Sequence, residues 1–115
     1  KLDELKKKIA YLELANIRLV EGDFSSTMTK NRRQPKKIAL ALLDCDLFNS
    51  YETSLNFIWP RLSRGGVIFL DEYFSLKFPG ARIATDKFFK ARKNEATLKR
   101  VSSDDTFERW IAVKL

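Results

Sequence analysis

Two apolar runs, each followed directly by carboxylates, constrain the fold of this chain more than any other feature. One run covers residues 38–43 and the other covers residues 67–70. A short, continuous apolar run bounded by turn residues is typical of a strand that is buried on both faces of a sheet. The sequence therefore predicts two buried strands with acidic ends. The carboxylates that follow them are Asp44, Asp46, Asp71 and Glu72.

The segment between the two runs has the pattern of a helix. Leu55 and Ile58 lie at helical spacing. Asn49 or Ser50 can cap the helix at its start, and Pro60 kinks or ends it before a glycine pair. Strand, helix and strand within about 35 residues have the size of one βαβ unit, in which the two strands are parallel.

The acidic residues are expected to converge. A right-handed crossover brings the carboxyl ends of two parallel strands to the same edge of the sheet. Open α/β sheets bind their ligands at this edge. Because four neighbouring carboxylates repel one another unless a cation or protons compensate, the sequence predicts an acidic ligand-binding edge.

Hydrophobic spacing predicts further elements on both sides of the central unit. An antiparallel hairpin with a turn over residues 103–107 closes the chain, and Ala84, Phe88 and Ala91 form the inner stripe of the helix before it. An α/β fold follows from this order of elements. The further helices cover residues 1–14 and 81–93, and the further strands cover residues 17–24, 97–102 and 109–115.

Composition limits the function classes. A chain of 115 residues makes one small domain or part of a larger one. No apolar run approaches the roughly 20 residues that span a membrane, and no signal peptide is evident. The single cysteine, Cys45, cannot form an internal disulfide, which suits a cytoplasmic location. Since the chain has no histidine, we expect any metal to be a hard ion held by oxygen.

The net charge of +7 is unevenly distributed. Residues 1–37 and 75–115 each carry ten basic and five acidic side chains, whereas residues 38–74 carry two basic and five acidic ones. Two interpretations remain open, a solvated basic surface around an acidic site and a basic module that contacts nucleic acid through residues 30–37 and 87–100. The first is favoured, because no helix-turn-helix, zinc-finger or basic-aromatic RNA-binding motif supports the second.

Three segments in order resemble one enzyme family. They read Gly22-x-Phe24-x-x-Thr27, Leu43-Asp44-x-Asp46-Leu47-x-x-Ser50-x-x-Thr53 and Gly65-Gly66-x-x-x-x-Asp71-x-Tyr73. This order resembles the macrocin O-methyltransferase family, which are class I methyltransferases that depend on S-adenosylmethionine (SAM). The resemblance extends from Ile17 onward. It implies that residues 1–115 form a single partial domain, which contains the C-terminal portion of a Rossmann-like sheet. The Gly-rich loop that would hold the methionine end of SAM is not found.

The resemblance also implies roles for individual residues. Asp44, Asp71 and Glu72 would hold Mg²⁺, and two vicinal hydroxyls of a sugar or catechol would complete its coordination. Asp46 would orient a water molecule or accept the proton of the acceptor hydroxyl. The contacts to the adenine of SAM would come from Asp23 and Phe24. The acceptor side would be walled by Tyr73 and Phe74.

Two positions depart from the patterns of related enzymes. The family usually has Asp where Glu72 stands, which adds one methylene to a metal ligand. Catechol-type enzymes have a lysine base at the position of Leu47, so a lysine-base mechanism is not expected here. Plainer interpretations also stand: Asp44 as a strand-end cap, Glu72 as a solvated loop residue and Asp23 as a turn former.

The sequence therefore predicts part of a SAM-dependent, metal-assisted O-methyltransferase that acts on a small hydroxylated molecule such as a sugar or natural product. A non-catalytic methyltransferase-like remnant that associates with partner chains is the further alternative. We expect the isolated chain to be inactive. We also expect residues 17–20 or a second chain to pair with the edge of residues 38–43, giving a homodimer or strand-paired oligomer in the second case.

Overall fold

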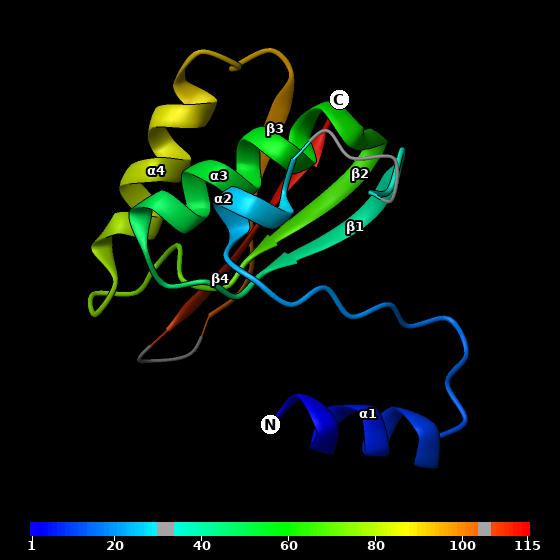
Figure 1. Cartoon of the computed structure of the whole chain (residues 1–115). Helices are drawn as coiled ribbons and strands as arrows, with labels where there is room; N and C mark the ends of the chain where they lie inside the picture. Colours follow the sequence, from blue (N-terminus) through cyan, green and yellow to red (C-terminus); the bar gives the residue numbers. More distant parts are fainter. Residues whose placement is uncertain (30–33, 104–106) are drawn as a thin grey trace.

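A computed structural model describes residues 1–29, 34–103 and 107–115. Figure 1 shows the helices gathered on one side of a twisted sheet, with α1 set apart from it. The helices are α1 (Leu2–Tyr11), α2 (Phe24–Thr27), α3 (Phe48–Ile58) and α4 (Pro79–Lys90), with the 3-10 turn η1 (Trp59–Arg61) after α3. The strands are β1 (Ile38–Leu43), β2 (Leu62–Leu70), β3 (Ala96–Ser103) and β4 (Glu108–Lys114).

The four strands form one sheet in the order β1-β2-β4-β3. The β1 and β2 strands are parallel, while β4 is antiparallel to both of its neighbours. This arrangement confirms the predicted βαβ unit and the antiparallel pairing of the last two strands, while the predicted turn over residues 103–107 lies mostly outside the described residues. In the register of the parallel pair, Leu43 lies opposite Leu70, so both strands reach the same edge of the sheet.

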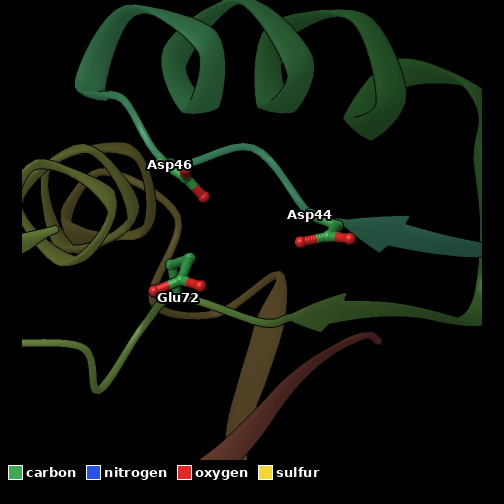
Figure 2. A group of neighbouring side chains, drawn as sticks. All are labelled: Asp44, Asp46 and Glu72. Carbon is green, nitrogen blue, oxygen red and sulfur yellow. The ribbon is translucent and has the colours of Figure 1, made fainter. Parts of the chain in front are cut away.

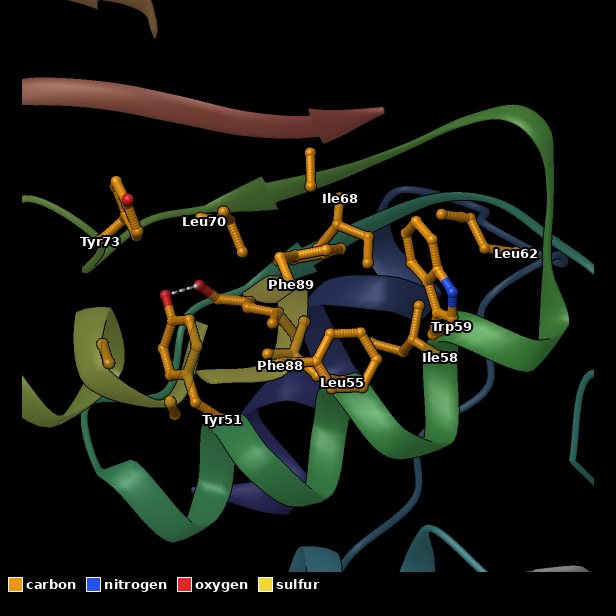
Figure 3. Close-up of a cluster of buried hydrophobic side chains, with 14 of the residues drawn as sticks. Tyr51, Leu55, Ile58, Trp59, Leu62, Ile68, Leu70, Tyr73, Phe88 and Phe89 are labelled. Carbon is orange, nitrogen blue, oxygen red and sulfur yellow. Dashed lines mark hydrogen bonds between the residues drawn. The ribbon is translucent and has the colours of Figure 1, made fainter. Parts of the chain in front are cut away.

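The core lies between the sheet and the pair of helices α3 and α4 (Figure 3). Leu55 of α3 and Ile68 of β2 are fully buried there. Trp59 packs edge to face against Phe88 and Phe89, with ring centroids 6.0 and 5.1 Å away. Burying a large apolar side chain stabilises the fold by about 1.5–3 kcal/mol, so these few residues anchor both helices to the sheet.

The expectation that β1 is buried on both faces is wrong. Leu40 and Leu42 leave 70% and 62% of their surface exposed, whereas Leu43 is buried. The reason is geometric, since α3 and α4 cover one face of the sheet and β1 forms its edge. Within the part of the chain that the structure describes, the other face carries no helix (Figure 1).

The predicted strand over residues 17–24 is also wrong. Residues 17–22 form no regular element, and α2 begins at Phe24. Ile17 and Val20 are exposed, and this segment does not pair with the edge of β1. An apolar run becomes a strand only when a neighbour accepts its backbone hydrogen bonds, and no described strand does so here.

Two helix boundaries differ from those predicted. The α4 helix begins at Pro79, whose fixed φ suits the first helical turn, and ends at Lys90. Ala91 therefore lies beyond the helix and is exposed, although Ala84 and Phe88 are buried as expected. The α3 helix begins after Leu47 without a side-chain cap, so neither Asn49 nor Ser50 caps it.

The glycine pair lies inside β2 and not in a turn before it. The register of β1 against β2 shifts between Ile38 and Leu40, which face Leu62 and Val67. The four intervening residues of β2 therefore form a bulge. Gly65 has φ +75°, and a Cβ on Gly66 would lie 2.7 Å from the Ser63 carbonyl oxygen, so the bulge needs both glycines.

None of the described helices is both long and apolar enough to cross a membrane. Residues 30–37, part of the alternative basic module, are only partly described. Lys36 and Lys37 are exposed, whereas Lys30, Arg32 and Arg33 lie outside the described residues.

Candidate functional site

Three carboxylates meet at the edge where β1 and β2 end. Asp44 follows β1, Asp46 lies in the loop before α3, and Glu72 lies just after β2 (Figure 2). One carboxylate oxygen from each residue lies within 4.8 Å of the others. Figure 2 shows the three side chains facing a common space. The convergence that the βαβ unit predicts is therefore present.

Asp71 lies beside this cluster but outside its closest group. Its backbone N–H donates to the carbonyl oxygen of Leu43 at 3.2 Å, which joins the two strand ends. Burial, and next the nearby Asp44 carboxylate, raise the pKa of Asp71, against the attraction of Arg109. The structure thus groups Asp44 and Glu72 with Asp46 most tightly, while the metal-ligand roles of Asp44, Asp71 and Glu72 remain predictions.

The clustered residues suit an oxygen-coordinated divalent ion. Asp44 and Asp46 are exposed and Glu72 is partly exposed, so a hydrated ion can reach them. Mg²⁺ binds oxygen at about 2.0–2.1 Å in an octahedron, so its ligands lie roughly 2.9 Å apart when adjacent and roughly 4.2 Å apart when opposite. The three carboxylate oxygens lie within 4.8 Å of one another, so their side chains would have to turn inward to bind one ion. An ion would also relieve the repulsion among three neighbouring negative charges.

Tyr51, which the sequence analysis did not single out, lies fully buried beneath this edge. Its hydroxyl group donates to the carbonyl oxygen of Leu43 at 3.2 Å and accepts the backbone N–H of Glu72 at 3.1 Å. Burial raises the pKa of Tyr51 well above its usual range, so the hydroxyl stays protonated. The available signal was an aromatic residue with a polar tip, placed one turn into the helix that follows the first acidic strand end.

A second tyrosine joins the segment after Glu72 to α4. The Tyr73 hydroxyl donates to Asp86 at 2.7 Å, and Arg82 lies 3.7 Å from the same carboxylate. Burial, and next the hydrogen bond to Asp86, raise the pKa of Tyr73 to about 12. A cavity of about 290 Å³ opens beside this network. Its lining residues are Phe74, Ser75, Leu76, Pro79, Arg82, Ile83 and Asp86.

Asp23 and Phe24 lie at another cavity, of about 250 Å³. Asp23 caps α2 by accepting hydrogen bonds from the backbone N–H and the hydroxyl of Ser25, at 2.8 and 2.5 Å. The hydrogen bond from the Ser25 hydroxyl, and next the one from the Ser25 backbone N–H, lower the pKa of Asp23. Ser50 and Thr53 of α3 complete this cavity, so two of the three sequence motifs meet there.

Cys45 lies between the two clustered aspartates and is partly buried. Burial raises the pKa of its thiol above the usual value, and the neighbouring carboxylates act in the same direction, although Ser54 opposes them. A thiol that resists ionisation is a poor nucleophile, so the geometry agrees with a structural role for Cys45.

Solved structures of methyltransferases share this fold. The O-methyltransferase NovP aligns with a TM-score of 0.77 at 19% identity, over 97% of this chain and 43% of NovP. Apo CalS11, described as a TDP-rhamnose 3'-O-methyltransferase of calicheamicin biosynthesis, aligns with a TM-score of 0.74 at 26% identity, over 97% of this chain and 50% of CalS11. A putative caffeoyl-CoA O-methyltransferase from Staphylococcus aureus aligns with a TM-score of 0.66 at 13% identity, over 98% of this chain and 59% of the S. aureus protein.

The chain thus spans about half the length of NovP and CalS11, and its α/β fold is the methyltransferase fold that the sequence predicts. No curated protein sequence matches it significantly. The sequence model of the macrocin O-methyltransferase (TylF) family matches residues 2–110. That match covers nearly the whole chain, and the chain therefore belongs to the macrocin O-methyltransferase family.

Proposed function

We propose that the protein is a SAM-dependent O-methyltransferase in which a divalent cation at the acidic edge assists methyl transfer to a hydroxyl group. The observation that carries the proposal is the meeting of three carboxylates at the end of the βαβ unit in a chain of this family. The similar structures are named as O-methyltransferases, and one of them is named for the sugar nucleotide TDP-rhamnose. A hydroxylated sugar or natural product is the corresponding acceptor for this chain.

The residues of the acidic edge divide into two roles. Asp44 and Glu72, with Asp71 beside them, would hold the cation, which when bound lowers the pKa of a neighbouring hydroxyl. Asp46 lies close enough to this pair to accept the proton that the acceptor hydroxyl releases. SAM supplies the methyl group in this family, and Asp23 and Phe24 would bind its adenine in the cavity beside α2.

The acceptor would lie in the cavity that follows Glu72. Phe74 and Leu76 offer apolar surface there, and Arg82 and Asp86 offer charged groups for hydrogen bonds. Such a mixture suits a ring that carries hydroxyl groups. Phe74 is two residues from Glu72, so the cavity begins close to the acidic edge along the chain, and a hydroxyl group of the acceptor would point from the cavity toward that edge. Proximity to the methyl donor would supply part of the acceleration.

The test is Asp44→Asn, which keeps the shape of the side chain but removes its charge. Methyl transfer from labelled SAM to a panel of sugar nucleotides is measured in the full-length protein, with Mg²⁺ and with chelator. We expect a loss of about 100-fold or more in the variant, because several kcal/mol of electrostatic assistance are removed. The control is Asp3→Asn on the distant helix α1, which should leave the rate unchanged. Full activity of wild-type protein in chelator would refute the role of the cation.

A further inference from the structure

The hydroxyl group of Tyr51 connects the two acidic strand ends through the backbone. It donates to the carbonyl oxygen of Leu43, the last residue of β1, and accepts the backbone N–H of Glu72. Leu43 directly precedes Asp44. One buried hydroxyl therefore lies between the backbone positions that carry two of the three clustered carboxylates.

The two hydrogen bonds of this hydroxyl are not equivalent. The carbonyl oxygen of Leu43 also accepts the backbone N–H of Asp71 at 3.2 Å, so it keeps a donor if the hydroxyl is removed. The Glu72 N–H, by contrast, loses the acceptor that Tyr51 gives it. The hydroxyl therefore acts mainly on Glu72, by fixing its backbone against the end of β1.

We propose that Tyr51 is a positioning residue for the carboxylate cluster, which sets the distance between Glu72 and Asp44. The inference rests on the proposed function, because the spacing matters most if a cation binds there. Small divalent ions demand closely defined ligand positions, and groups that orient the ligands contribute to affinity. The position of the Glu72 backbone decides how far its carboxylate can reach, so a displaced backbone would move the carboxylate away from Asp44.

The surroundings of Tyr51 suit this role. Its side chain is fully buried in the core that α3 and α4 form against the sheet, so the ring has no freedom to swing away. Its hydroxyl keeps its proton across the physiological pH range, because burial and the nearby acidic side chains disfavour the phenolate. The donor to Leu43 is therefore present at every pH at which the enzyme would work.

The substitution Tyr51→Phe tests the proposal, because it removes the hydroxyl and leaves the ring. The matched control is Thr85→Val, which also removes a fully buried hydroxyl, but one whose hydrogen bond to Ala81 stays within α4. Mn²⁺ affinity is measured by titration calorimetry and stability by urea unfolding. We expect Tyr51→Phe to weaken Mn²⁺ binding about tenfold, whereas Thr85→Val lowers the unfolding midpoint without changing Mn²⁺ affinity.

A second readout needs no cation. Hydrogen exchange of the Glu72 amide, followed by NMR in chelator, should be faster in Tyr51→Phe than in the wild type, while exchange of the Ile68 amide stays the same. Equal exchange at Glu72 in the two proteins overturns the proposal, as does equal Mn²⁺ affinity. If the wild type binds no Mn²⁺, the proposed role of the cation fails, and exchange at Glu72 alone then supports or overturns the positioning role.

Discussion

Single residues at the acidic edge differ in how far the sequence predicts them. Asp44, Asp46 and Glu72 follow apolar runs, and the parallel pairing of those runs is enough to bring them together. Tyr51 could not be predicted in the same way. A tyrosine one turn into a helix faces the core or the solvent depending on how the helix rotates against the sheet, and only the packing of α3 decides this.

The charge of Asp71 gives a pH-dependent prediction. Because the pKa of Asp71 is raised in the folded state, ionisation of Asp71 lowers the free energy of unfolding. The stabilising effect of protonated Asp71 is complete below about pH 4, where Asp71 is protonated even in the unfolded chain, and is lost as the pH rises through the raised pKa. Asp71→Asn should therefore raise the melting temperature at pH 7 and leave it nearly unchanged at pH 3. Thermal unfolding at both pH values checks this, with Asp3→Asn as the exposed control. A larger gain at pH 3 would contradict it.

At the level of whole elements, those with a continuous hydrophobic pattern were predicted well, and short segments whose structure depends on a neighbouring strand were predicted poorly. The β1, α3 and β2 elements and the hairpin have strong periodicity or clear turn residues, and each lies within a few residues of its predicted place. Residues 17–24 have the composition of a strand but no partner among the described residues. The glycine pair has the composition of a turn, yet the register of β2 against β1 makes it a bulge.

The bulge in β2 yields a second prediction. Gly65 has φ +75°, a conformation that side chains with a Cβ rarely adopt, although its surroundings leave room for one. Gly65→Ala should therefore destabilise the protein by about 1 kcal/mol through backbone strain alone. Gly65→Asn should cost less, since Asn tolerates this conformation. Urea unfolding of both variants checks the order, and equal losses would exclude a conformational cause.

At the scale of the molecule, the described residues give the sheet one packed face and one open face, which the sequence did not predict. Leu55→Ala, in the packed core, should lower the free energy of unfolding by about 3 kcal/mol, because it leaves a cavity. Leu40→Ala makes the same chemical change on the open face and should alter it by no more than about 0.5 kcal/mol. Chemical denaturation compares them directly. A large loss in Leu40→Ala would mean that the open face is covered in solution.

The place of β4 between β2 and β3 has a consequence for how the protein is made. On the ribosome, β2 is complete long before its second neighbour exists, because residues 71–107 must be added before β4 begins. At about 5–20 residues per second, this interval lasts roughly 2–8 s. After β2 emerges from the ribosome and before β4 does so, β2 presents an unpaired apolar edge with which another chain can pair. Translation that is slow between β2 and β4 should therefore increase aggregation without any change in the finished fold.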